Sequence, residues 1–469
     1  MPITSEEMAR WCHRLSGGGA APRRTLEEYI EAIPRLATLG DLPAGTAVLV
    51  RGDLDVKPGP RVGDGDVRLR SMRETIEFGR TRGWKQVLFG HVGRKPEGSL
   101  SAVARRLSEI LGAEVELISD WLDEQRVSVA GAASERIAAA APGSVLVLEN
   151  TRRYAIERVL WDASADDVEQ LATPLAKLAN EMAQKVARVY VNEAFSAGSL
   201  DSSTTVVPAA MERVALGAYV AREFDGPMRR CLASSFVVFS GLKIDKLDDL
   251  AAMIDRGSIR RVLAAGSLAM ALAKATAELD GRRFCLGVAE DASHADKPYY
   301  IPPDRIAQAR RLIENAGRRG IEFILPVDYV LADGRIVTEL GASDQQFDVG
   351  PKSSELFERK VGELIAENRA RREGEPPPVV FHNGVFGMFE DTRFENGTRR
   401  FITQLKRMTD AGIEVYVGGG EGGTALEQYG KLDWVTHCFT AGGTVLNALG
   451  SQPVPYLVAL QLASERLAS

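Results

Sequence analysis

The sequence predicts two doubly wound, parallel-sheet α/β domains of Rossmann-like type, joined by a hinge helix. Three observations support this fold class. At 469 residues, the chain is too long for one ordinary hydrophobic core. Short apolar runs recur along it, each followed by a helical stretch, a pattern typical of parallel strands buried on both faces. The runs also fall into two series separated by a long helical segment.

The first series contains four apolar runs, and the second contains five. In the first series the runs span 46–54, 85–91, 144–150 and 188–195. In the second they span 235–241, 260–266, 322–328, 378–384 and 414–420. The intervening segment 206–234 reads as a helix that ends at Asp225-Gly226-Pro227, so we expect a domain boundary near residue 228. The glycines in 17–19 predict a mobile N-terminal extension over residues 1–25.

The composition excludes several classes of protein. A net charge of −6 argues against a nucleic-acid binder, because phosphate backbones call for a broad basic field. The four cysteines are scattered without metal-ligand or redox spacing, which favours reduced thiols in a cytoplasm. No apolar run is long enough to span a bilayer, and the N-terminus lacks the apolar stretch of a signal peptide. We expect a cytoplasmic protein.

Charged side chains follow the strands of the first series. Ligands of an open parallel sheet lie beyond the carboxyl ends of its strands. The segments at those ends are 51–55, 91–94, 149–153 and 192–199. They bring arginine, histidine and acidic side chains to one sheet edge, and guanidinium groups bind phosphate and carboxylate through paired hydrogen bonds. The first domain is therefore predicted to bind a small anion.

Glycines follow the strands of the second series. They fall in 240–243, 265–267, 383–384, 418–423 and 441–443. Glycines ahead of a helix let backbone N–H groups close on phosphate at the helix N-terminus. There is no Walker pattern and no convincing GxGxxG, but several such turns at one sheet edge, with two lysines, indicate a nucleotide polyphosphate. An anion on one domain and a nucleotide on the other require domain closure to bring the reactants together.

The first half contains, in this order, VLVRGDLDV, DVRLR, GHVGRKP and LENTRRY. These motifs resemble those of phosphoglycerate kinases, in the same order. VLVRGDLDV is similar to that family's first strand and its Arg-x-Asp-x-Asn turn, GHVGRKP to Ser-His-Leu-Gly-Arg-Pro, and LENTRRY to Leu-Glu-Asn-x-Arg-Phe-His. DVRLR places Arg68 on the arginine that is expected to meet the reacting carboxyl group and the transferring phosphoryl group. The resemblance implies these acceptor-binding residues: Asp53, Asp55, Arg68, His91, Arg94, Arg152 and Arg153.

Motifs of the second half resemble the same family. SGLKIDKL is similar to Gly-Gly-Ala-Lys-Val-x-Asp-Lys, HNGVFGMFE to Trp-Asn-Gly-Pro-x-Gly-x-Phe-Glu, GGGEGGT to Gly-Gly-Gly-Asp-Thr, and THCFTAGGT to His-x-Ser-Thr-Gly-Gly-Gly-Ala. The resemblance implies these nucleotide-binding residues: Gly241, Lys243, Lys246, Gly266, Asn383, Glu390, Gly418, Gly419, Gly420, Glu421, Thr424 and Gly442. It implies these catalytic residues: Arg68, Lys243, Gly420 and Gly443.

The resemblance implies a kinase of the phosphoglycerate kinase fold, with an acceptor-binding domain over 26–228 and a nucleotide-binding domain over 229–450. The segment 451–469 is expected to return to the first domain. The implied reaction is a reversible phosphoryl transfer from ATP to a carboxylate, with 3-phosphoglycerate as the default acceptor and 1,3-bisphosphoglycerate as the product. Mg²⁺ accompanies ATP or ADP, with Glu421 as its ligand in place of an aspartate. The family resemblance also suggests a monomer.

The sequence departs from the family pattern most clearly after the fourth apolar run. VNEAFSAGS resembles Val-Asn-Asp-Ala-Phe-Gly-Thr-Ala-His-Arg, but Ser199 and Leu200 replace the His-Arg pair and Glu193 replaces the aspartate. The missing arginine helps to hold the acceptor's own phosphate in the family. Two alternatives therefore stand beside the default: a paralogue that phosphorylates a different carboxylic acid, and a catalytically impaired nucleotide-binding regulatory protein.

Overall fold

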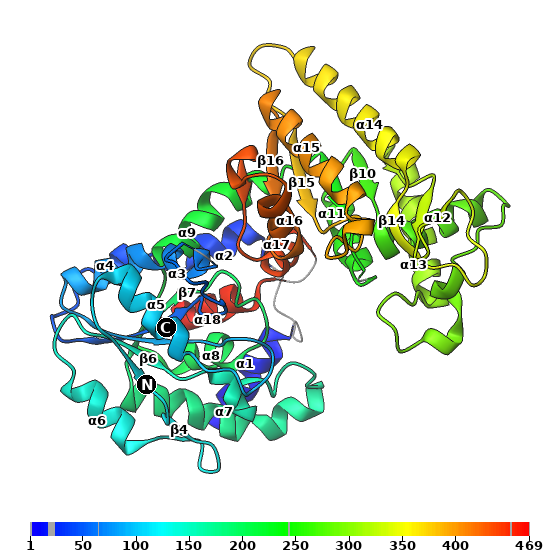
Figure 1. Ribbon diagram of the computed structural model, residues 1–469. Coiled ribbons are helices and arrows are strands. Elements are labelled where there is room, and N and C mark those ends of the chain that lie inside the picture. Colours follow the sequence, from blue (N-terminus) through cyan, green and yellow to red (C-terminus); the bar gives the residue numbers. More distant parts are fainter. Residues whose placement is uncertain (1, 17–23, 64, 243, 451–452, 469) are drawn as a thin grey trace. The chain divides into compact units, whose positions relative to one another are not determined.

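The structure is a computed structural model that describes residues 2–16, 24–63, 65–242, 244–450 and 453–468 (Figure 1). The predicted catalytic residue Lys243 lies outside these ranges. The chain divides into two compact units, here called unit 1 (Met1–Gly226 with Gln452–Ser469) and unit 2 (Pro227–Ser451). Within the described ranges, none of the helices combines the length and the apolar character that a membrane crossing requires.

Unit 1 is built on a parallel sheet of six strands in the order β3-β6-β2-β1-β7-β8. The strands are β1 (Ala47–Gly52), β2 (Lys85–Phe89), β3 (Val115–Ile118), β6 (Val145–Leu148), β7 (Val189–Glu193) and β8 (Arg213–Leu216). The four apolar runs predicted as strands of the first series are β1, β2, β6 and β7. The sheet gains β3 and β8 at its two edges, and β4 (Leu122–Asp123) pairs separately with β5 (Ser128–Val129).

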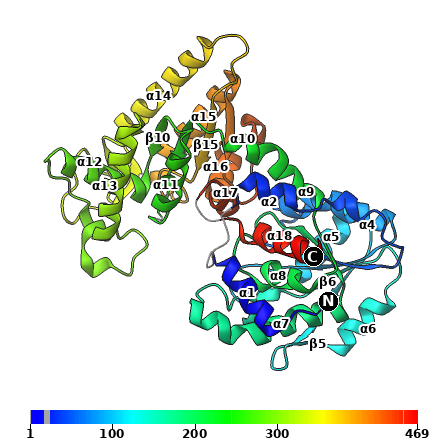
Figure 2. The same cartoon turned by 180° about the vertical axis from the view of Figure 1, so that it is seen from behind.

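Helices cover the sheet of unit 1. They are α1 (Ser5–Leu15), α2 (Leu26–Ala32), α3 (Val67–Ser71), α4 (Arg73–Thr81), α5 (Ser101–Leu111), α6 (Gly131–Ala139), α7 (Ala165–Lys185), α8 (Ser202–Thr205), α9 (Ala218–Glu223) and α18 (Pro455–Ala468). Side chains of α3, α4 and α5 form one apolar cluster with alternate residues of the strands, such as Val48 and Val50. Helix α18 follows unit 2 in the sequence but packs against α1, α2 and α8 of unit 1 (Figure 2).

Unit 2 repeats the plan with the strand order β11-β10-β9-β15-β16-β17, again parallel. These strands are β9 (Phe236–Phe239), β10 (Arg261–Ala264), β11 (Glu322–Ile324), β15 (Val379–Asn383), β16 (Glu414–Val417) and β17 (His437–Cys438). All five predicted runs of the second series are strands. A small antiparallel sheet adds β12 (Tyr329–Leu331), β13 (Ile336–Val337) and β14 (Gln346–Val349).

The helices of unit 2 are α10 (Arg229–Cys231), α11 (Lys246–Arg256), α12 (Gly266–Leu279), α13 (Pro303–Arg318), α14 (Pro351–Arg369), α15 (Asn396–Asp410), α16 (Glu421–Tyr429) and α17 (Gly442–Leu449). Helices α14, α15 and α16 share one apolar cluster with the central strands. Helix α12 packs on α13, and α11 contacts both α13 and α17. Three helices, α12, α16 and α17, begin directly after strands β10, β16 and β17.

The segment predicted as one helix over 206–234 is more varied. It contains strand β8, then α9, a π-helical turn over Phe224–Met228, and α10. The helical prediction is therefore wrong for Arg213–Leu216, where pairing with β7 overrides local helical preference. The hinge helix corresponds to the continuous helical stretch 218–231, and the division between the units falls inside it, after Gly226.

The prediction of a mobile extension over 1–25 is wrong for most of the part that the structure describes. Helix α1 begins with a capping box between Thr4 and Glu7 and packs against α7. It buries the side chains of Met8, Trp11 and Cys12, and the Trp11 indole donates a hydrogen bond to the Thr205 carbonyl at 2.7 Å. An amphipathic helix with a buried indole belongs to the core of unit 1. Residues 17–23 lie outside the described ranges.

Candidate active site

The carboxyl edge of the unit 1 sheet gathers charged side chains, as its strand ends predict. Asp53 follows β1, His91 follows β2, and Arg152 lies in a turn after β6. All three side chains are buried. Parallel strands end at the same sheet edge, so residues about 40 to 100 positions apart in sequence meet here.

One buried carboxylate, Asp201, is the centre of this cluster. It is fully buried, just before α8. Arg152 donates to it from Nη2 at 3.2 Å, and the Trp161 indole donates at 2.9 Å. Arg51 Nη2 lies 3.7 Å from the same carboxylate. The Arg152 guanidinium also lies over the Trp161 ring, 4.8 Å from its centroid.

His91 is held as a neutral imidazole. Burial lowers its pKa well below 6.5, and the charges of Arg51, Arg152 and Arg68 lower it further. Arg51 Nη2 lies 2.9 Å from His91 Nδ1. A guanidinium can only donate, so Nδ1 accepts and the proton of the neutral ring is on Nε2. His91 can therefore donate one hydrogen bond from Nε2, but it is not placed to act as a base near neutral pH.

Arg68 connects two acidic residues beside the same edge. It lies in α3, where its Nη1 donates to the Asp55 backbone carbonyl at 3.0 Å. Its guanidinium lies 3.7 Å from the carboxylates of both Asp53 and Asp55. Asp53 accepts from the Ser196 hydroxyl at 2.6 Å, and Asp55 accepts from the Gly93 N–H at 2.8 Å. His91 Nε2 lies 3.9 Å from the Asp55 carboxylate, and Arg152 Nη1 donates to the Gly93 carbonyl. Contacts thus link five of the predicted acceptor residues, namely Asp53, Asp55, Arg68, His91 and Arg152.

The remaining two predicted acceptor residues are more exposed. Arg94 is exposed in the turn after β2. Arg153 has a side chain that is 43% exposed, and it lies 3.9 Å from the Glu149 carboxylate. Ser199 is exposed and Leu200 is half-buried in the loop that precedes Asp201.

Three buried residues complete the cluster and were not predicted as site residues. Arg51 Nε donates to the Ser203 hydroxyl at 3.0 Å, and that hydroxyl donates to Glu157 at 2.6 Å. Burial, together with the charge of Asp201, raises the pKa of Glu157 to about 7. Arg51 is a charged residue inside an apolar strand, which is a signal that this strand ends at a polar site. Glu157 and Ser203 lie in short segments with no comparable sequence signal.

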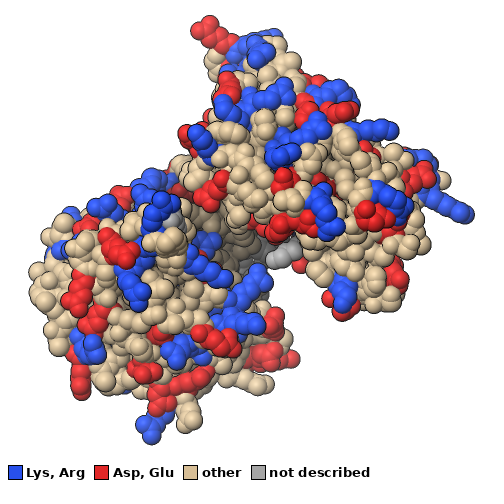
Figure 3. All heavy atoms as spheres, in the orientation of Figure 1, with Lys and Arg blue, Asp and Glu red and all other residues tan. Residues whose placement is uncertain are grey.

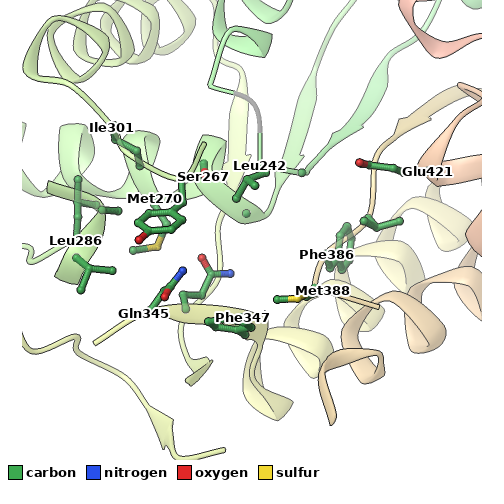
Figure 4. Close-up of a pocket in the computed structure, with 18 of the residues that line it drawn as sticks. Leu242, Ser267, Met270, Leu286, Ile301, Gln345, Phe347, Phe386, Met388 and Glu421 are labelled. Atoms are coloured by element: carbon green, nitrogen blue, oxygen red, sulfur yellow. The ribbon is translucent and has the colours of Figure 1, made fainter. Parts of the chain in front are cut away.

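Unit 2 contains a cavity of about 410 Å³, lined largely by apolar side chains (Figure 4). Met270, Leu286 and Ile301 lie at one end of the view, and Phe386, Met388 and Glu421 lie at the other. Gln345 and Phe347 form one wall. A mainly apolar cavity with few polar groups is typical of a site for a small molecule or cofactor. Glu390, Gly241 and Gly266 of the predicted nucleotide residues line the same cavity.

The glycine turns of unit 2 meet beside this cavity. A Cβ on Gly266 would lie 2.5 Å from the Gly241 carbonyl oxygen. A Cβ on Gly418 would lie 2.5 Å from Asn383 Nδ2, and one on Gly442 would lie 3.0 Å from the same atom. The turns are therefore packed backbone against backbone, with the buried Asn383 side chain between two of them. Such turns bring backbone N–H groups close to a ligand.

The other predicted nucleotide residues lie around the same turns. Lys246 is the first residue of α11, and its ammonium group donates to the Ser240 carbonyl. Gly420 caps α16 with a positive φ of 72°, and the exposed Glu421 is the first residue of that helix. Gly443 lies in the first turn of α17, and Thr424 is an exposed residue of α16. Gly419 is close to the Phe439 carbonyl, since a Cβ there would lie 2.2 Å from it.

His382 is buried in β15. Its Nε2 lies 2.7 Å from the Gly384 carbonyl oxygen, which can only accept, so Nε2 carries the proton. Burial lowers its pKa to about 4, so the ring is neutral at neutral pH. Its ring is stacked on Phe386, a residue of the cavity wall. His382 thus fixes the backbone after β15 and supports one side of the cavity.

The described residues contain no group of three or more histidine, cysteine, aspartate or glutamate side chains that could hold a metal ion. Glu421 offers one exposed carboxylate at the cavity. Mg²⁺ is commonly held by one or two carboxylates together with substrate phosphates. The donor set of unit 2 therefore fits a magnesium ion that arrives with a nucleotide. On the face drawn in Figure 3, basic and acidic side chains are interspersed.

Comparisons with known proteins identify similar chains. A family model described as phosphoglycerate kinase matches residues 41–452. Phosphoglycerate kinase of Synechococcus elongatus is 30% identical over 455 residues, which cover 91% of this chain and 98% of that protein. Cytosolic phosphoglycerate kinase of Triticum aestivum is 29% identical over 450 residues, which cover 91% and 98%. The crystal structure of phosphoglycerate kinase from Pyrococcus horikoshii OT3 shares the fold, with a TM-score of 0.69 and 24% identity over 92% of this chain and 100% of that one.

Proposed function

This chain belongs to the phosphoglycerate kinase family, and from that premise we propose that it transfers the γ-phosphoryl group of ATP reversibly to the carboxylate of 3-phosphoglycerate. The products are 1,3-bisphosphoglycerate and ADP. The family match over residues 41–452 carries the proposal. The charged sheet edge of unit 1 and the glycine turns of unit 2 support it, because they suit a small anion and a nucleotide.

The acceptor binds at the sheet edge of unit 1. Its carboxylate oxygen is the nucleophile, and it is already ionised at neutral pH, so the reaction requires no general base. The neutral His91 is consistent with this, because its Nε2–H orients an anion by donation and takes no proton. Arg68 neutralises charge on the carboxylate and on the transferring phosphoryl group, and Asp53 and Asp55 hold its guanidinium in place.

The nucleotide binds in unit 2. The adenine ring occupies the apolar cavity beside Met270 and Phe347, and Glu390 at its margin accepts from the ribose hydroxyls. The phosphates lie against the N-termini of α16 and α17, where Gly420 and Gly443 offer backbone N–H groups. Lys243 is proposed to neutralise the transferring phosphoryl group. Glu421 would hold Mg²⁺, which when bound offsets the charge of the nucleotide phosphates.

In the reaction the carboxylate oxygen forms a bond to the γ-phosphorus as the bond to the β–γ bridging oxygen breaks, and ADP leaves with that electron pair. Catalysis then depends on positioning and charge neutralisation. Two similar proteins, from Triticum aestivum and Arabidopsis thaliana, are named as cytosolic, which supports a cytoplasmic location.

A second candidate function is favoured by one observation. Ser199 and Leu200 replace the His-Arg pair of the family, and the neighbouring Asp201 already accepts a hydrogen bond from Arg152. A carboxylic acid other than 3-phosphoglycerate could then be the better acceptor.

The proposal is tested by mixing the protein with Mg-ATP, 3-phosphoglycerate and hydroxylamine, which traps acyl phosphates as hydroxamates. We expect hydroxamate formation that depends on both substrates and is lost in Lys243→Ala. Calorimetry with ATP on the same variant shows whether it still folds and binds nucleotide. Hydroxamate formation no greater than that of Lys243→Ala would refute 3-phosphoglycerate as the acceptor, and a panel of other carboxylic acids then tests the second candidate.

A further inference from the structure

Asp201 draws hydrogen-bond donors of the acceptor site inward. Its carboxylate accepts from Arg152 and from the Trp161 indole, at 3.2 and 2.9 Å. Arg51 Nη2 approaches it to 3.7 Å. The carboxylate is fully buried, so it stays close to these partners without competition from bulk water.

The Arg152 guanidinium is engaged by groups of the protein itself. Its side chain is only 7% exposed. Nη2 donates to Asp201 and Nη1 donates to the Gly93 carbonyl at 2.9 Å, while the face of the group covers Trp161. Its Nε–H is buried and has no hydrogen-bond partner within the described residues. Nε of Arg152 thus makes no hydrogen bond to a described residue while Nη2 donates to Asp201. The charge attraction between Arg152 and Asp201 offsets the cost of the unpaired N–H.

Arg51 is oriented inward as well. It is 1% exposed, and its three nitrogens are directed to the Ser203 hydroxyl, the Gly52 carbonyl and His91. Arg51 therefore directs all three of its nitrogens to acceptors of the protein itself, and Arg152 directs both of its terminal nitrogens to such acceptors. Arg94 and Arg153 are the more exposed cations at this edge. The charge available to an incoming anion is smaller than the number of arginines in the sequence motifs indicates.

We propose that Asp201 is a specificity-determining residue of the acceptor site: it competes with the acceptor's own anionic group for the Arg152 guanidinium. This inference rests on the proposed function for the identity of the acceptor. A phosphate that enters the site can bind the Arg152 guanidinium only by displacing the Asp201 carboxylate, which is already bound to it. This exchange replaces one charge-assisted hydrogen bond with another, so the net gain in binding free energy is small. The site then favours carboxylic acids with few negative charges more than a site with free arginines does.

Asp201→Asn tests the proposal, because the amide keeps the shape and the ability to accept but removes the charge. Asp41→Asn is a matched control, because Asp41 is an exposed residue of unit 1 that pairs with Arg213 at 2.7 Å. The measurement is calorimetric binding of 3-phosphoglycerate and of D-glycerate, the same acid without its phosphate. Circular dichroism and a thermal melt show whether each variant is folded.

We expect Asp201→Asn to tighten the binding of 3-phosphoglycerate about 10-fold, and that of D-glycerate less than about 3-fold. The control Asp41→Asn should leave the affinity for both acids unchanged. An unchanged affinity for 3-phosphoglycerate in a folded Asp201→Asn protein would overturn the proposal. An equal change for both acids would overturn it too, because it would show that Asp201 acts on the general structure of the site.

The unaltered protein gives a second test that depends on no variant. We expect it to bind 3-phosphoglycerate no more than about 30-fold more tightly than D-glycerate, which corresponds to a single charge-assisted contact. A greater preference, or binding of neither acid, would overturn the proposal. Binding does not require turnover. If the acids bind as expected but neither is phosphorylated, the proposed function fails and the inference about Asp201 stands.

Discussion

Gly266→Ala is expected to damage the nucleotide site through a single methyl group. Gly266 lines the cavity of unit 2 and has a positive φ of 63°. A Cβ there would lie 2.5 Å from the Gly241 carbonyl oxygen and 3.0 Å from the Gly241 nitrogen. Both contacts are with backbone, so a side-chain rotation cannot relieve them. The turn that contains Gly241 or the start of α12 must move.

The expected free-energy cost of Gly266→Ala has two parts. A left-handed conformation costs an alanine about 1–2 kcal/mol, and an overpacked contact costs about 1–3 kcal/mol more. Gly281→Ala isolates the first part, because Gly281 has a φ of 71° and a Cβ there meets nothing within 4 Å. The difference between the two variants is therefore the cost of the clash at the nucleotide site.

The assay is calorimetric titration of Mg-ATP into the two variants and the unaltered protein, together with thermal melts. Gly266→Ala should bind ATP at least about 10-fold more weakly, since 1.4 kcal/mol corresponds to a factor of ten. Gly281→Ala should lose stability but keep its affinity within about 2-fold. If Gly266→Ala binds ATP as Gly281→Ala does, the nucleotide phosphates do not lie against this turn.

Three further outcomes follow from the structure. Trp11→Ala should reduce the free energy of unfolding of unit 1 by about 3–5 kcal/mol in urea titrations. Arg10→Ala, at an exposed position of α1, should have little effect. Equal effects of the two variants would contradict the packing of α1 against unit 1. Burial raises the pKa of Glu193 from 4.5 to about 7. The contribution of Glu193 to the free energy of unfolding is therefore complete below pH 4.5 and is lost as pH rises through 7. Glu193→Gln should lose less stability between pH 5 and 8 than the unaltered protein, and equal losses would contradict the raised pKa. The pKa of His91 is well below 6.5, so its ring ¹⁵N resonances should show a neutral Nε2–H form from pH 8 to 6. These resonances are assigned by their loss in His91→Gln. A titration midpoint of the His91 ring near pH 6.5 would contradict the buried position.

Most of the fold could be predicted from the sequence because buried parallel strands are continuous apolar runs. Eight of the nine predicted runs are inner strands of the two sheets, and the ninth is the edge strand β11. The missed strands β3, β8 and β17 lie at sheet edges or are short, where the apolar pattern is weak. In β8 the sequence RVAL lies in a stretch with helical periodicity, and only its pairing with β7 makes it a strand.

The candidate site could be predicted where residues directly follow strands. Asp53, His91 and Arg152 were found in this way, because strand order alone brings them to one edge. Asp201 was not, because it lies eight residues beyond the end of β7, ahead of a Ser-Ser-Thr-Thr turn, where an aspartate is an ordinary helix cap. Its role depends on Trp161 and Arg152, which approach it only in the folded unit.

The most direct test of phosphoryl transfer to a carboxylate uses 3-phosphoglycerate with ¹⁸O in both carboxylate oxygens. The protein is mixed with this acid, Mg-ATP and hydroxylamine. If a carboxylate oxygen attacks the γ-phosphorus, hydroxylamine attack at the acyl carbon releases inorganic phosphate that contains one ¹⁸O. Its ³¹P resonance should then be shifted by that isotope. Inorganic phosphate without ¹⁸O would show that ATP is only hydrolysed, and this result would contradict the proposed reaction.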